Sequence, residues 1–258
     1  MTTPTIVLLH GQPDSSASFW RLRRELAARL PAGIRILAPD RPGYGANLLP
    51  ARGYAGNVEW LASWLAQVQA GPTVLVGHSW AGGAAALAAA ADPDLAGLVL
   101  LASVGPDCLL KIDPVLAAPV LGEAIAFGTL RLARPIISRR AASVIIGNQP
   151  EPDRPFARTS GLAMRFRPVW RSFLTEQRAL MRELPDIDAA LARISTPTQI
   201  ISGLQDPVIP ARTPQALRAR IRQASSHQIA GGHDLQLRQP AQVAELVAAF
   251  ALPLLDRP

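Results

Sequence analysis

The sequence has a single cysteine, Cys108, and this excludes a disulfide framework and a cysteine-rich metal site. It also lacks the marks of export and membrane insertion. Its first residues carry no basic stretch ahead of an apolar run, so we expect no signal peptide. Residues 60–91 contain no charged side chain, but glycine, proline, glutamine, serine and histidine interrupt them, so we expect no membrane span. These absences favour a cytoplasmic location without membrane insertion.

Lysine is nearly absent, because Lys111 is the sole lysine among 26 basic residues. Eleven arginines lie between Arg131 and Arg182 against three acidic residues, so this segment is strongly basic. Such a surface suits an anionic substrate, a membrane surface or nucleic acid. We favour a solvated helical face, because the arginines are not interleaved with aromatic residues and no nucleic-acid-binding motif is present. We therefore expect no nucleic-acid partner, and the same face would suit a homodimer.

Short apolar runs alternate with helical patterns along most of the chain. Nearly half of the 258 residues are apolar, which is enough to bury a large core. Buried strands are predicted at residues 5–9, 34–38, 73–76, 98–102, 198–202 and 226–230. Helices are predicted at residues 18–30, 81–91 and 239–250, and another helix is expected to begin at Asn57 as its N-cap.

Six strands that alternate with helices predict an α/β fold: a doubly wound, mostly parallel sheet with helices on both faces. Between the fourth and fifth strands the pattern is helical and punctuated by proline. We expect residues 1–104 and 193–258 to form the core domain, and residues 105–192 to form a helical lid inserted after the fourth strand. Sites in open α/β sheets lie at the carboxyl ends of the strands.

One serine stands where a predicted strand turns directly into a helix. Ser79 lies in the stretch Gly-His-Ser-Trp-Ala, which spans residues 77–81. A sharp turn would project its hydroxyl above the sheet, at a helix N-terminus that favours developing negative charge. The residues two before and two after the serine must then be small, and they are Gly77 and Ala81.

This stretch resembles the nucleophile elbow of the α/β-hydrolase fold superfamily, in its serine hydrolase branch, written Gly-x-Ser-x-Gly. Ala81 stands where the last glycine is usual, and we interpret the elbow as intact. The resemblance makes Ser79 the nucleophile. It also makes His10-Gly11-Gln12-Pro13 the loop that contributes to the oxyanion hole, so that the backbone N–H groups of Gln12 and Trp80 would bind the oxyanion.

Two later segments are similar to the remaining motifs of the family. Ser202-Gly203-Leu204-Gln205-Asp206 resembles the segment that carries the catalytic acid, and Gly231-Gly232-His233 resembles the segment that carries the base. The order Ser79, Asp206, His233 is the order expected for this fold. Asp107, just beyond the fourth strand, is the alternative acid. We expect activity to rise with pH as His233 loses its proton.

The type of nucleophile selects among members of the family. Haloalkane dehalogenases and epoxide hydrolases of this fold use aspartate at the elbow, whereas a serine indicates attack on an acyl carbonyl. The resemblance therefore implies a hydrolase that cleaves a carboxylic ester of a small, mainly apolar substrate through an acyl-enzyme, with no cofactor and no metal. Alternatives are a lyase or cofactor-free perhydrolase that uses the same triad, or a ligand-binding relative with little turnover.

The lid would determine specificity. Trp80, Phe166 and Trp170 are the side chains we expect to contact the substrate, and Trp80 would line an acyl pocket. Tyr44, in Asp40-Arg-Pro-Gly-Tyr-Gly, is a further candidate to approach the site. Glu176 is a candidate to bind a substrate amine.

Overall fold

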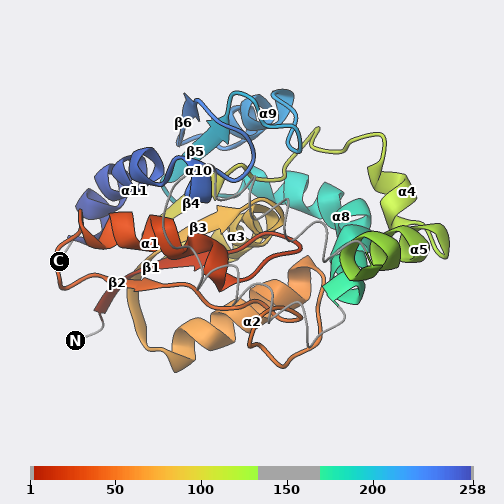
Figure 1. Cartoon of the computed structure of the whole chain (residues 1–258). Helices are drawn as coiled ribbons and strands as arrows, with labels where there is room; N and C mark the ends of the chain where they lie inside the picture. Colours follow the sequence, from red (N-terminus) through yellow and green to blue (C-terminus); the bar gives the residue numbers. More distant parts are fainter. Residues whose placement is uncertain (1–2, 133–168, 257–258) are drawn as a thin grey trace, which may run out of the picture.

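The computed structural model describes residues 3–132 and 169–256 (Figure 1). Its centre is one sheet of six strands, all parallel, in the order β2-β1-β3-β4-β5-β6. The strands are β1 (Thr3–Leu9), β2 (Arg35–Leu37), β3 (Ala70–His78), β4 (Gly97–Leu101), β5 (Thr198–Gly203) and β6 (Ala224–Ile229). The predicted doubly wound α/β fold is confirmed, and each predicted strand is present within a few residues of its expected bounds.

Helices cover both faces of the sheet (Figure 1). In the core they are α1 (Trp20–Ala27), α2 (Tyr54–Gln67), α3 (Trp80–Ala91), α9 (Arg212–Arg220), α10 (Leu235–Arg238) and α11 (Pro240–Leu255). A short 3-10 helix, η1 (Ser16–Phe19), precedes α1. The helix predicted to begin at Asn57 begins at Tyr54 instead. Asn57 is not its cap, because the Asn57 amide donates to the carbonyl oxygens of Arg52 and Gly53 from inside the first turn.

The alternation of side chains along the strands divides the core into two layers. Val7, Leu75 and Leu100 point to the face covered by α2, α3, α8 and α9. Their neighbours in sequence point to the opposite face, where α1, α10 and α11 pack. Because successive residues of a strand face opposite sides, a strand buried on both faces reads as a continuous apolar run. This explains why β1, β3, β4 and β5 are recognisable in the sequence.

The segment between β4 and β5 is helical where it is described. It contains α4 (Asp113–Ala117), α5 (Leu121–Phe127), the π-helix η2 (Gly128–Leu132) and α8 (Val169–Leu191). The helices α4 and α5 pack against α8, and α8 also packs against α3 and α2 of the core. The long helix α8 therefore connects the inserted segment to α3, the helix that follows Ser79 in the chain. The division into a core and a separate lid stays a prediction.

The end of β3 leaves no room for a side chain at Gly77. A Cβ atom added there would lie 2.7 Å from the Gly82 Cα and 2.8 Å from the Ala81 carbonyl oxygen. These are backbone atoms, which cannot move aside without opening the turn.

We therefore predict that Gly77→Ala lowers the free energy of unfolding by about 1–3 kcal/mol, as overpacking of a tight site does. Chemical denaturation of the variant measures this change. The matched control is Gly33→Ala, since a Cβ at Gly33 would meet no atom within 4 Å. Equal stability of the two variants would contradict the steric account of the turn.

Candidate active site

Ser79 occupies a strained joint between β3 and α3. Its backbone has φ 55° and ψ −125°, a conformation that residues with a side chain rarely adopt. Backbone hydrogen bonds hold it there: the Ser79 N–H donates to the Leu101 carbonyl at 3.0 Å, and the Ser79 carbonyl accepts from Gly82 at 2.9 Å and Val104 at 3.2 Å. The surrounding structure thus fixes the serine at the carboxyl end of the sheet.

The loop after β1 lies directly against this serine. A Cβ added at Gly11 would lie 2.9 Å from the Ser79 Cβ, so only glycine allows the approach. On the other side, a Cβ added at Gly82 would overlap the Ser103 side chain. Ala81 stands where the last glycine of the motif is usual, and it is fully buried as the second residue of α3. The turn is therefore closed with Ala81 in place.

His233 bridges Ser79 and Asp206 through its two ring nitrogens. Nε2 lies 2.9 Å from the Ser79 Oγ, and Nδ1 lies 2.9 Å from an Asp206 carboxylate oxygen. A carboxylate only accepts hydrogen bonds, so Nδ1 carries the proton and the lone pair of Nε2 faces the hydroxyl. The structure brings the three residues predicted from separate motifs into one hydrogen-bonded chain. The alternative acid, Asp107, is exposed and is not part of this chain.

The environment of Asp206 favours its ionised form. Burial alone would raise the pKa of this carboxyl, but the hydrogen bond to His233 and the N–H groups of Ile209 and Val208 outweigh burial and hold the pKa below its ordinary value. The two backbone donors reach the second carboxylate oxygen at 2.9 and 2.8 Å. Asp206 is therefore a fixed anion that orients the ring of His233.

A second histidine, His78, packs against His233. The rings of His78 and His233 are 5.0 Å apart, and His78 packs edge-on against Phe19. Nε2 of His78 lies 3.2 Å from the His233 carbonyl oxygen and so donates to it. Burial, and then the proximity of His233, lower the pKa of His78 to about 4. His78 is thus neutral near pH 7 and adds no positive charge beside His233.

Two backbone N–H groups are candidates to receive an oxyanion. Trp80 is the first residue of α3, where an N–H has no partner within the helix. Within the described part of the chain, neither this N–H nor that of Gln12 has an assigned acceptor. The Gln12 side chain is engaged elsewhere: it donates to Gln177 of α8 at 3.0 Å, and Gln177 donates to Asp113 of α4 at 2.9 Å.

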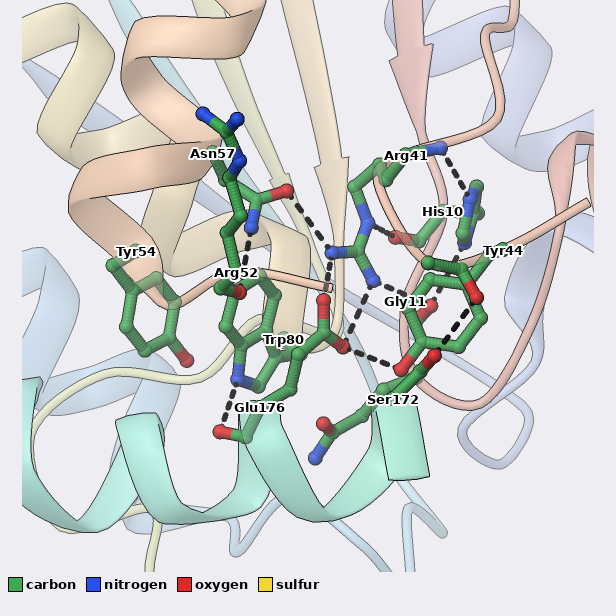
Figure 2. Close-up of polar contacts among 12 residues, drawn as sticks. His10, Gly11, Arg41, Tyr44, Arg52, Tyr54, Asn57, Trp80, Ser172 and Glu176 are labelled. Carbon is green, nitrogen blue, oxygen red and sulfur yellow. Dashed lines mark hydrogen bonds and ion pairs between the residues drawn. The ribbon is translucent and has the colours of Figure 1, made fainter. Parts of the chain in front are cut away.

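Three residues expected near the substrate lie in the core (Figure 2). The Trp80 ring is fully buried, stacks on Tyr54 with centroids 4.0 Å apart, and donates its Nε1–H to the Glu176 carbonyl at 3.0 Å. These contacts hold the ring in place, and its role in lining an acyl pocket stays a prediction. Glu176 is fully buried and pairs with Arg41, so it is not free to bind a substrate amine. Tyr44 is buried and donates its hydroxyl to Glu176 at 2.8 Å.

The remaining candidates lie on or beside the inserted segment. Trp170 is the second residue of α8 and packs edge-on against Phe127 of α5, with ring centroids 5.7 Å apart. The Arg171 guanidinium lies over the same ring. Phe166 lies outside the described residues. The roles of Trp170 and Phe166 in substrate binding stay predictions.

The buried partnership of Arg41 and Glu176 was not predicted from the sequence. Arg41 lies in the loop after β2, and Glu176 lies 135 positions later, in α8. The only hint of this pair in the sequence is Glu176 itself, because it is one of three acidic residues between Arg131 and Arg182. A charge of the minority sign in such a segment indicates a specific partner, but its position in the chain does not identify that partner.

Neither a metal centre nor a membrane-spanning helix is found among the described residues. No group of three or more histidine, cysteine, aspartate or glutamate side chains is arranged to hold a metal ion there. None of the helices in residues 3–132 and 169–256 is both long and apolar enough to span a membrane.

Comparison with known proteins places this geometry in a family. The chain is 28% identical over 225 residues to a haloalkane dehalogenase of Mycolicibacterium paratuberculosis, covering 80% of this chain and 69% of the relative. It is 28% identical over 237 residues to the magnesium-chelatase 30 kDa subunit of Rhodobacter capsulatus, covering 89% and 80%. An esterase from Exiguobacterium antarcticum shares the fold, with a TM-score of 0.74 and 18% identity over 97% of this chain and 92% of the esterase.

The model of the alpha/beta hydrolase family matches residues 6–246, which include the second half of β1, the turn at Ser79, Asp206 and His233. The match extends over almost the whole described sheet and the inserted segment. The chain therefore belongs to the alpha/beta hydrolase family and is a hydrolytic enzyme.

Proposed function

We propose that this enzyme hydrolyses a carboxylic ester, or a related acyl bond, of a small and mainly apolar substrate through an acyl-enzyme on Ser79. The observation that carries the proposal is the position of His233. One ring meets both the serine hydroxyl and a buried carboxylate at hydrogen-bond distance. This is the arrangement that activates an otherwise weak hydroxyl nucleophile.

In the first half of the reaction, the Ser79 Oγ attacks the ester carbonyl while His233 Nε2 takes the hydroxyl proton. The carbonyl oxygen becomes an oxyanion, which the N–H groups of Gln12 and Trp80 bind. The tetrahedral intermediate collapses, the bond to the alcohol breaks, and His233 gives its proton to the leaving oxygen. The acyl group stays on Ser79.

In the second half, a water molecule replaces the alcohol. His233 takes a proton from the water as its oxygen attacks the acyl carbonyl, and returns that proton to Ser79 when the acid leaves. Asp206 stays ionised throughout, holds the ring in the productive tautomer, and stabilises the positive charge that the ring carries transiently. No metal ion or cofactor enters these steps.

Dehalogenation, the reaction for which the Mycolicibacterium paratuberculosis relative is named, does not suit this site. The elbow holds a serine hydroxyl, whereas dehalogenases of this fold use a carboxylate there. A lyase or a perhydrolase would use the same three residues, and analysis of the products distinguishes these reactions from hydrolysis. We also propose that residues 105–192 act as the specificity-determining cap. The cytoplasmic location and the homodimer stay predictions.

A fluorophosphonate probe tests the nucleophile, because it reacts with an activated serine. We predict one adduct per chain, mapped by peptide mass spectrometry to Ser79, and its loss in Ser79→Ala and in His233→Ala. Hydrolysis of a p-nitrophenyl ester is expected to fall by about 10³-fold or more in both variants. Full activity of a folded Ser79→Ala variant would refute the proposal.

Exchange of the two candidate acids for their amides tests the orienting carboxylate. Asp206→Asn keeps the shape of the side chain but no longer fixes the proton on Nδ1, so we predict a fall in kcat of about 10²-fold or more. Asp107→Asn is the matched control, since Asp107 is exposed and apart from the chain of hydrogen bonds. Steady-state kinetics that show the reverse order of effects would assign the acid to Asp107.

A further inference from the structure

Arg41 lies at the centre of a buried polar cluster that joins distant parts of the chain (Figure 2). Its side chain is 1% exposed, and that of Glu176 is 0% exposed. A guanidinium has five N–H donors, and all five have an acceptor here. The donors meet both Glu176 carboxylate oxygens, the Asn57 side-chain oxygen, and the carbonyl oxygens of His10 and Gly11.

Arg41 and Glu176 form an ion pair inside the core. Burial works against the charge of Arg41, but the Glu176 carboxylate outweighs burial and raises the pKa of Arg41 above its ordinary value. The guanidinium therefore stays charged, and its donors stay available to the two carbonyl oxygens. Nε lies 2.6 Å from the His10 oxygen, and Nη2 lies 2.9 Å from the Gly11 oxygen.

The contact with Gly11 also determines the direction of the next N–H. The Gly11 carbonyl and the Gln12 N–H belong to one planar trans peptide unit, in which the two groups point in opposite directions. A donor that fixes the carbonyl therefore fixes the N–H. A cationic donor also polarises the peptide unit and strengthens the N–H as a donor.

His10 supports the same carbonyl and depends on the same arginine. Its Nδ1 lies 2.9 Å from the Gly11 oxygen and so donates to it, which leaves Nε2 to accept the Arg41 backbone N–H at 3.0 Å. Burial, and then Arg41, lower the pKa of His10 well below its ordinary value, so the ring is neutral. The backbone and side chain of Arg41 thus act together on one peptide unit.

We propose that Arg41 is a positioning residue that aims the Gln12 N–H at the oxyanion, and that Glu176 of α8 holds Arg41 in place. This inference rests on the proposed function, because aiming the N–H affects the rate only if an oxyanion forms at Ser79. Arg41 itself touches no reacting atom.

The helix α8 has other attachments to the core besides those that depend on the contacts of Arg41 with the His10 and Gly11 carbonyl oxygens. Glu176 is also held by the Trp80 indole and the Tyr44 hydroxyl, and Ser172 donates to the Gly43 carbonyl at 2.9 Å. The contacts of Arg41 with the loop after β1 therefore have a role that is separable from the packing of α8.

Arg41→Lys separates the two roles. Lysine keeps the positive charge opposite Glu176, but its single ammonium lacks the planar fork that also reaches both carbonyl oxygens. With a p-nitrophenyl ester we expect kcat to fall at least 10-fold and KM to stay within twofold, because the aimed N–H acts in the transition state.

A boronic acid provides a second readout that a purely structural role would not change. Its boron accepts the Ser79 oxygen while the hydroxyl proton passes to His233, and the resulting tetrahedral anion places an oxygen where the oxyanion forms. We expect its dissociation constant to rise in Arg41→Lys by about the factor by which kcat falls. Thermal unfolding checks that the variant is folded.

Arg178→Lys is the matched control. Arg178 also lies on α8, pairs with Glu123 at 3.0 Å and donates to the Ala117 carbonyl, but it does not contact the loop after β1. We expect its kcat and boronic acid affinity to stay within twofold of the unaltered enzyme. If Arg41→Lys does not fold, Glu176→Gln is read by the same two measurements, with a loss in both expected.

A folded Arg41→Lys enzyme with unchanged kcat and unchanged boronic acid affinity would overturn this inference and leave the proposed function intact. Absence of ester turnover and of boronic acid binding in the unaltered enzyme would instead overturn the proposed function. The two failures are therefore distinguishable.

Discussion

The site depends on one steric constraint, the sharp turn that carries Ser79 from the end of β3 into α3. The serine adopts φ 55° and ψ −125°, and glycines at its flanks leave space that a single Cβ would fill. Gly77 allows α3 to start directly after β3, and Gly11 allows the loop after β1 to lie against the serine. The turn therefore sets both the exposure of the hydroxyl and the distance to the proposed oxyanion donor.

The second determinant of the site is an electrostatic interaction between residues far apart in the chain. Arg41 and Glu176 form a buried ion pair that links the loop after β2 to α8. Breaking such a pair by removing one partner is costly, because it leaves an uncompensated charge in the core. Arg41 also packs over the Trp80 ring, with its guanidinium 4.7 Å from the ring centroid. Trp80, which directly follows the nucleophile Ser79, therefore packs in the core.

Local patterns predicted much of this structure, because the features concerned are local. The strands β1, β3, β4 and β5 are mostly buried, so their apolar runs are visible in the sequence. The turn at Ser79 requires small residues at fixed positions. The grouping of Ser79, Asp206 and His233 followed from a resemblance in motif order. Asn57 was misplaced because a helix boundary depends on hydrogen bonds that the sequence pattern does not specify.

The functions assigned to single side chains were harder to predict. Trp80, Tyr44 and Glu176 each belong to residue types that commonly contact substrates, and each is buried in contacts between elements far apart in the chain. No periodicity pairs Arg41 with a glutamate 135 positions away. Side-chain direction at such positions is determined by tertiary packing, and a single sequence carries little of that information.

The acyl-enzyme on Ser79 is the central claim, and partitioning of products tests it most directly. Two esters that share an acyl group but differ in their leaving alcohol are hydrolysed in water that contains methanol. An acyl-enzyme common to both predicts one ratio of free acid to methyl ester, whatever the leaving group. A ratio that changes with the leaving group would mean that water attacks the substrate directly, and would contradict the account.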